Sequence, residues 1–95
     1  MRNILITGGS SGIGEALVKE SLKQNFRVFF TYLHNEKSAK NLVKKNKKNC
    51  YAIKADLSSQ DDVNLIFKTI KKKTNKIDCI VNNASQKFKK KSFRI

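Results

Sequence analysis

The chain has 95 residues, so it can form one small domain with a marginal hydrophobic core. Hydrophobic residues make up 39% of it, which argues against global disorder, and no apolar run is long enough to cross a bilayer. The opening residues 1–6 are followed too soon by glycines to be a signal peptide, so we expect a cytoplasmic protein.

The formal net charge of +14 has two explanations. One is a nucleic-acid or anionic-membrane partner. The other is biased composition, because Lys, Asn, Ile and Phe are all frequent here and all use A/T-rich codons. Lys far outnumbers Arg, whereas proteins that read bases rely on the Arg fork. We therefore favour biased composition and expect neither a nucleic-acid nor a membrane partner.

An apolar run at residues 3–7 predicts a buried first strand, and a helical pattern runs from residue 12 to about residue 24. Strand, glycine-rich turn and helix present free backbone N–H groups to a phosphate. Gly8 lets the chain leave the strand sharply, Gly12 lets a pyrophosphate approach the backbone, and Gly14 lets the helix pack closely on the sheet. The expected phosphate contacts are Ser10, Ser11, Gly12 and Ile13. The alternative is an ordinary strand-to-helix turn.

The remaining elements follow in alternation. Strands are expected at residues 27–32, 51–53 and 77–81, and helices at residues 36–46 and from about residue 60, where Ser58 or Ser59 caps the N-terminus. In the first helix we expect one packed face, made by Ile13, Ala16 and Leu17 with Val18 and Leu22 beside it. We expect Asn25 to adopt the left-handed conformation after the helix.

This β-α-β-α-β-α-β alternation predicts an α/β fold, a Rossmann-like doubly wound parallel sheet of which only part is present. The expected strand order is 3-2-1-4, with a ligand crevice between the first and fourth strands. Cys50 and Cys79 have neither metal-site nor redox spacing and fall on strands that are not neighbours. We expect both to be small buried residues without a disulfide.

Three motifs resemble the short-chain dehydrogenase/reductase family. Thr7, Gly8, Gly12, Ile13 and Gly14 match its cofactor loop, T-G-x-x-x-G-I-G. Residues 55–58 resemble the acidic pair after its third strand, and residues 82–85 resemble its N-N-A-G motif with Ser85 in place of glycine. The resemblance covers nearly the whole chain but only the N-terminal part of the family's domain. It implies a dinucleotide-binding half-domain at residues 1–85 and a basic loop or truncated tail at residues 86–95.

The resemblance also implies site residues and a reaction. Asp56 is expected to accept a hydrogen bond from the adenine amino group, with the Leu57 backbone against the ring; the alternative is an Asp that only starts the next helix. Asn82, Asn83 and Ala84 are expected beside the cofactor riboses, and the same motif is expected to tie adjacent strands together. The parent reaction would be hydride transfer between a nicotinamide cofactor, NADP or NAD, and a small carbonyl or alcohol substrate, in a full-length protein that is a possible homo-oligomer.

The end of the second strand bears on cofactor choice. Enzymes that prefer NAD place an acid there for the ribose 2′-hydroxyl, but this chain has Tyr32 and no acid before Glu36. This favours NADP over NAD. Against it, Ser11 stands where relatives that prefer NADP often carry Arg or Lys, leaving Lys37 or His34 to supply a charge.

The family's catalytic Tyr-x-x-x-Lys pair is absent from these 95 residues, because Glu36 follows Tyr32 at that spacing and Ala55 follows Tyr51. We therefore assign no catalytic residue and no metal ligand, and expect a fragment that is inactive alone. The alternatives are a non-catalytic dinucleotide-binding module and a basic nucleic-acid-binding α/β protein.

Overall fold

The computed structural model describes residues 1–10 and 12–84. Strands and helices alternate over this part as expected. In chain order they are β1 Asn3–Thr7, α1 Gly12–Lys23, β2 Arg27–Tyr32, α2 Glu36–Lys45, β3 Cys50–Lys54, α3 Gln60–Lys71 and β4 Cys79–Asn82. The largest shift is in β4, which begins two residues later than the sequence predicts. The expected contact at Ser11 and the expected tail at residues 86–95 lie outside the described residues.

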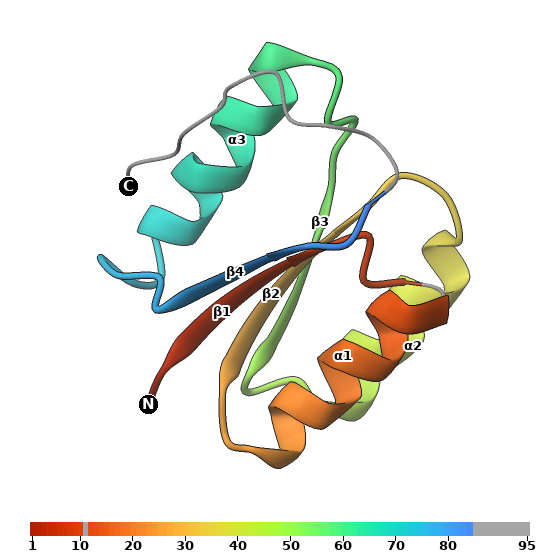
Figure 1. Ribbon diagram of the computed structural model, residues 1–95, viewed down its shortest axis with the longest axis vertical. Helices are drawn as coiled ribbons and strands as arrows, with labels where there is room; N and C mark the ends of the chain where they lie inside the picture. The colour runs from red at the N-terminus through yellow and green to blue at the C-terminus, as the bar shows by residue number, and fades with distance from the viewer. Residues whose placement is uncertain (11, 85–95) are drawn as a thin grey trace.

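The strands form one parallel sheet in the order β3-β2-β1-β4, which confirms the predicted order (Figure 1). Helices α1 and α2 cover one face of the sheet and α3 covers the other. Successive strand residues point to opposite faces. Thus Ile4, Ile6 and Phe30 pack with α1 and α2, whereas Leu5 and Phe29 pack with α3. Helices cover both faces of β1, which explains why this strand is apolar without alternation.

The ends of the helices follow the local sequence. Of the two candidate caps for α3, Ser59 is the one used, since its hydroxyl accepts a hydrogen bond from the backbone nitrogen of Asp62 at 3.3 Å. After α1, Asn25 adopts the predicted left-handed conformation, with φ of 65°. None of the described helices is both long and apolar enough to span a bilayer.

The predicted packed face of α1 is correct only in part. Val18 is buried, and Leu17 and Leu22 pack against the core, as expected. Ile13 is 73% exposed and Ala16 is also exposed, whereas Gly14 and Ser21 are buried. The cause is the close approach of the helix to the β1 turn at Gly14. This contact turns the Gly14–Val18–Ser21 stripe toward the sheet and Ile13 away from it.

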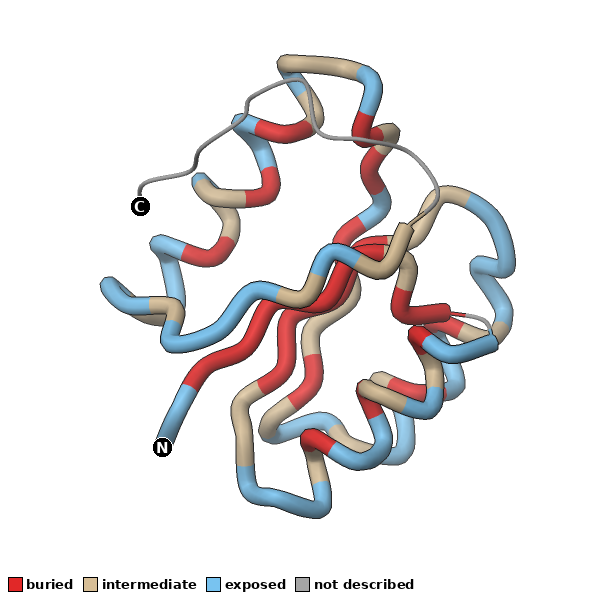
Figure 2. The backbone as a smooth tube through the Cα atoms, viewed as in Figure 1, coloured by how far each residue is buried: buried red, intermediate tan, exposed pale blue. Residues whose placement is uncertain are grey.

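The predicted burial of Cys79 is also wrong. Figure 2 shows β4 largely exposed beside the fully buried β1, and Ile80 is 41% exposed. The reason is that β4 is an edge strand whose outer side no described residue covers. Cys50 is buried as expected, and burial raises the pKa of its thiol to about 11. Both cysteines are free, as the separation of β3 from β4 requires.

Candidate cofactor site

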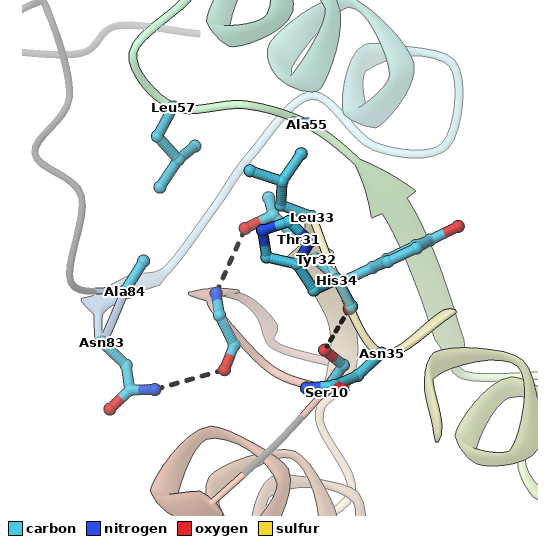
Figure 3. Close-up of a pocket in the computed structure, with 11 residues that line it drawn as sticks. Ser10, Thr31, Tyr32, Leu33, His34, Asn35, Ala55, Leu57, Asn83 and Ala84 are labelled. Carbon is cyan, nitrogen blue, oxygen red and sulfur yellow. Dashed lines mark hydrogen bonds between the residues drawn. The ribbon is translucent and has the colours of Figure 1, made fainter. Parts of the chain in front are cut away.

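A cavity of about 300 Å³ opens at the carboxyl ends of the strands (Figure 3). This is where ligands bind in open α/β sheets, at the point where the strand order reverses. The volume is at the lower end of the range for small-molecule sites, roughly 300–1,000 Å³. The lining residues are Gly8, Ser10, Thr31, Tyr32, Leu33, His34, Asn35, Ala55, Leu57, Asn83 and Ala84.

The hydroxyl of Thr7 ties the two strands at this crevice together. Thr7 is fully buried, and its Oγ1 donates to Oδ1 of Asn82 at 2.9 Å. The same oxygen accepts from the backbone nitrogens of Asn83, at 2.9 Å, and Ala84, at 3.1 Å. The residues that follow β4 are therefore held against the end of β1, and the Asn-Asn-Ala motif has the strand-joining role implied by its resemblance.

Gly8 and Gly14 bring the turn and the helix into direct contact. Gly8 has φ of +69°, a backbone conformation that residues with a Cβ rarely adopt. A Cβ at this position would lie 3.1 Å from the Cα of Ala84. A Cβ on Gly14 would overlap the carbonyl oxygen of Gly8 and lie 2.7 Å from Nδ2 of Asn83. Asn83 Nδ2 itself donates to that carbonyl at 3.2 Å. Gly14 thus permits the close helix packing that the sequence predicts.

Gly12 differs from these glycines because the space above it is open. Its φ is +57°, and a Cβ built there meets no described heavy atom within 4 Å. A ligand group can therefore approach the backbone at the N-terminus of α1, where the helix dipole favours an anion. The neighbouring Ile13 side chain points into solvent, so only its backbone is suited to a phosphate contact.

The glycine turn is also anchored to β2. Ser10 is buried, and its hydroxyl donates to the carbonyl of His34 at 3.2 Å (Figure 3). Gly9 donates from its backbone nitrogen to the carbonyl of Thr31 at 3.0 Å. A Cβ on Gly9 would lie 2.6 Å from Cβ of Phe30, so this position excludes a side chain. No role for Gly9 was predictable from the sequence, because this requirement arises from a residue on another strand.

The connection after β2 forms the side wall of the cavity. Tyr32 ends β2, and its ring extends toward β3 and away from Asn83 and Ala84 (Figure 3). His34 and Asn35 continue the wall, and Asn35 has φ of 60° in the turn before α2. The end of β2 is thus part of the cavity, as predicted, and carries no acid.

Asp56 makes hydrogen bonds that organise the start of α3. Its Oδ1 accepts from the backbone nitrogen of Ser58 at 2.9 Å and from the Ser58 hydroxyl at 2.6 Å. Its backbone nitrogen donates to Oδ2 of Asp62 at 2.8 Å. Asp56 does not line the cavity, but its neighbours Ala55 and Leu57 do. The helix-starting role is therefore present in the structure, and the adenine contact stays a prediction.

The structure brings some of the predicted site residues together around the cavity. The predicted residues that line it are Gly8, Ser10, Tyr32, Leu57, Asn83 and Ala84. Gly12, Ile13 and Gly14 lie at the adjoining helix start, and Asp56 is not among the lining residues. The sequence analysis missed Thr31, Leu33, Asn35 and Ala55 as lining residues. Their positions at the carboxyl ends of β2 and β3 were the available sign.

These features define a Rossmann-like fold with a cavity at the carboxyl edge of its parallel sheet. The short chain dehydrogenase family matches residues 2–94, and this chain belongs to that family. A short-chain dehydrogenase/reductase homolog, YusS of Bacillus subtilis, is 34% identical over 84 residues, covering 85% of this chain and 77% of that protein. Farnesol dehydrogenase of Aedes aegypti is 34% identical over 83 residues, which are 84% of this chain but 34% of that enzyme. The chain thus spans about a third of the longer relative.

Two solved structures of cofactor complexes share this fold. The RhlG/NADP active-site complex from Pseudomonas aeruginosa superimposes with a TM-score of 0.75 and 33% identity, over 90% of this chain and 35% of that one. A 3-ketoacyl-(acyl-carrier-protein) reductase from Brucella melitensis complexed with NADH gives a TM-score of 0.76 and 26% identity, over 83% of this chain and 32% of that one. Relatives of this chain therefore bind either dinucleotide.

Proposed function

We propose that the chain binds a nicotinamide dinucleotide at the carboxyl edge of its sheet. The observation that carries the proposal is Gly12, whose open, positive-φ backbone lies at the start of α1 beside the cavity. A phosphate fits such a position because no side chain blocks it and the helix N-terminus favours negative charge.

Each part of the site has a task in this proposal. The backbone from Ser10 to Ile13 holds the pyrophosphate, and Leu57 lies against the adenine. Asn83 and Ala84 lie beside the riboses, held there by the Thr7 hydroxyl. The half-buried Tyr32 marks the 2′-position of the adenosine ribose. Since no acid ends β2, we propose a preference for NADP over NAD.

The parent activity that we propose is hydride transfer between this cofactor and a carbonyl or alcohol substrate. When bound, the cofactor supplies or accepts the hydride. The described residues bind and orient it through the Gly8–Gly14 turn and the β4 end. The proton that accompanies the hydride requires a donor, and these 95 residues contain no Tyr-x-x-x-Lys.

A non-catalytic dinucleotide-binding module is the second candidate, and the same absence favours it. The two candidates share the binding step and differ only in turnover. Calorimetric titration of the chain with NADPH and NADH tests that shared step. We expect micromolar to millimolar binding, about 4–8 kcal/mol.

Gly12→Val should weaken dinucleotide binding, because a valine strains the positive φ and its side chain fills the open space. Ile13→Ala serves as its control, since the exposed Ile13 side chain should not matter. Equal affinity of the original chain and a folded Gly12→Val variant would remove the phosphate-cradle proposal.

A further inference from the structure

The edge of the sheet opposite the cofactor cavity is strongly basic. All four strands run parallel, so their first residues and the C-termini of all three helices lie at that edge (Figure 1). We call its basic residues the amino-edge cluster. They are Arg2, Lys23, Arg27, Lys44, Lys45, Lys47, Lys48, Lys71, Lys72, Lys73 and Lys76. All are exposed except Arg27, which is half-buried.

Direct contacts join segments of this cluster that are distant in sequence. Nη1 of Arg27, at the start of β2, donates to the carbonyl of Lys73, after α3, at 3.1 Å. Nζ of Lys73 lies 5.3 Å from the ring centre of Tyr51 on β3. The backbone nitrogen of Arg27 also donates to the carbonyl of Arg2 at 2.8 Å. These contacts bring together Arg2, the start of β2, strand β3 and the segment after α3.

Little negative charge offsets this surface. Two acids lie at this edge, Glu20 in the last turn of α1 and Asp78 before β4. The carboxylate of Glu20 accepts from Nε2 of Gln24 at 3.0 Å, and that of Asp78 accepts from the backbone of Asn3, at 2.7 Å, and from Nζ of Lys76, at 3.1 Å. The other acids lie at the first turns of the helices or after β3, toward the cofactor edge: Glu15, Glu36, Asp56, Asp61 and Asp62. Among the described residues, Lys76 is the one lysine of the cluster that forms an ion pair with a carboxylate. The other ion pairs involve lysines outside the cluster, Lys19, Lys40 and Lys54.

The helix dipole explains only part of this placement. A cation in the last turn is favoured by the partial negative charge there, which accounts for Lys23, Lys44, Lys45 and Lys71, and for Lys72 at the C-cap of α3. The effect fades beyond the helix end, so it does not account for Lys47, Lys48, Lys73 or Lys76. Biased composition explains how many lysines the chain has, but not why they gather at one edge.

We propose that the amino-edge cluster binds the phosphate backbone of a nucleic acid without reading its sequence. Lysines act as point charges toward phosphates, and the scarcity of Arg fits backbone contact better than base recognition. The shortest principal extent of the molecule is 19 Å, a length over which duplex DNA carries roughly 11 phosphates. A surface of this size can therefore contact several phosphates at once.

An anionic membrane is the competing partner, and the apolar surface argues against it. Stable membrane binding by a basic surface needs apolar side chains that insert beside the charges. The large exposed apolar residues of the described chain are Met1, Ile13, Leu65 and Ile80. Only Met1 belongs to the amino edge, since Ile13 lies at the N-terminus of α1 and Leu65 in the middle of α3.

The test compares two triple variants of the full 95-residue chain that lose equal charge. The first, Lys47→Gln/Lys48→Gln/Lys72→Gln, removes three charges from the amino edge. The control, Lys19→Gln/Lys37→Gln/Lys54→Gln, removes three exposed charges away from that edge. Residues 85–95 stay unchanged in both, and circular dichroism confirms that both fold. Binding to a fluorescent 20-base-pair duplex of mixed sequence is followed by anisotropy at several salt concentrations.

We expect the amino-edge variant to bind about tenfold or more weakly, and the slope of log K against log salt to fall by roughly two to three. The control should stay within about twofold of the original chain. Equal losses in the two variants, or no duplex binding at low salt, would overturn the proposal. Binding only to vesicles of mixed neutral and anionic phospholipid would instead assign the surface to membranes.

Saturating NADPH separates this proposal from the cofactor proposal. Because the two edges lie at opposite ends of the strands, NADPH should leave duplex affinity unchanged. Competition between them would place the duplex at the cofactor edge and overturn the inference. A chain that binds duplex through the amino edge but binds no NADPH would sustain the inference while the cofactor proposal fails.

Discussion

The hydroxyl oxygen of Thr7 lies 2.9 Å from the backbone nitrogen of Asn83 and so joins the end of β1 to the residue after β4. Residues 76 positions apart in sequence are thereby fixed on the two sides of the crevice. The same oxygen also bonds Asn82 and Ala84. The geometry of the proposed ribose contacts therefore depends on a side chain that does not itself line the cavity.

Thr7→Val should destabilise the fold, because it keeps the shape of the side chain but removes this hydroxyl. The backbone N–H groups of Asn83 and Ala84 lose a buried acceptor, which costs about 1–3 kcal/mol. Urea unfolding followed by circular dichroism measures the change. Thr7→Ser retains the oxygen and should recover most of the loss. If the Ser and Val variants are equally stable, the hydroxyl does not hold the crevice.

Tyr32→Asp should shift cofactor preference toward NADH. A carboxylate at the end of β2 can accept from the ribose 2′-hydroxyl and repels a 2′-phosphate. We expect the ratio of NADPH to NADH affinity to fall about tenfold, or about 1.4 kcal/mol. Calorimetric titrations with both cofactors measure this ratio, and Tyr32→Asn controls for the lost ring. An original chain that binds NADH more tightly than NADPH would contradict the proposed preference.

Asp78 should make stability depend on pH in the acid range. The backbone N–H of Asn3 and then the Lys76 side chain lower the pKa of Asp78 below its ordinary value of 3.8. The ionised Asp78 therefore stabilises the fold fully when the pH is well above 3.8. This stabilisation is lost as the pH falls from about 5 through the lowered pKa of the folded state. Urea unfolding between about pH 7 and pH 3 should show Asp78→Asn less stable at neutral pH, with the difference shrinking as acid is added. A difference that does not change with pH would contradict this role.

Local sequence determined much of what was predicted correctly. The glycine turn, Asn25 and the Ser59 cap each act through residues close in sequence, so the elements and their order were predictable. The errors at Ile13 and Cys79 have a different origin. The exposure of Ile13 depends on Gly14 meeting Gly8, and that of Cys79 depends on what covers the outer side of β4. The requirement for Gly9 likewise comes from Phe30, a tertiary contact that no local pattern contains.

The 95-residue chain should oxidise no NADPH in the presence of ketones or aldehydes. A positioned general acid contributes about 10²–10⁴-fold to such reactions, and the sequence offers no Tyr-x-x-x-Lys to provide it. The measurement is loss of NADPH absorbance with a panel of carbonyl compounds, against cofactor alone. Turnover above that background, abolished by Gly12→Val, would show that another residue of this chain supplies the proton.

The most direct test of the cofactor site is an NMR titration of the ¹⁵N-labelled chain with NADPH. The account predicts that the largest amide shifts fall at Gly8, Ser10, Gly12, Ile13, Leu57 and Ala84, around the carboxyl edge of the sheet. Amides at the amino edge, such as those of Lys47 and Lys72, should stay in place. Shifts concentrated at the amino edge, or none at saturating NADPH, would contradict the claim that this cavity and glycine turn hold a dinucleotide.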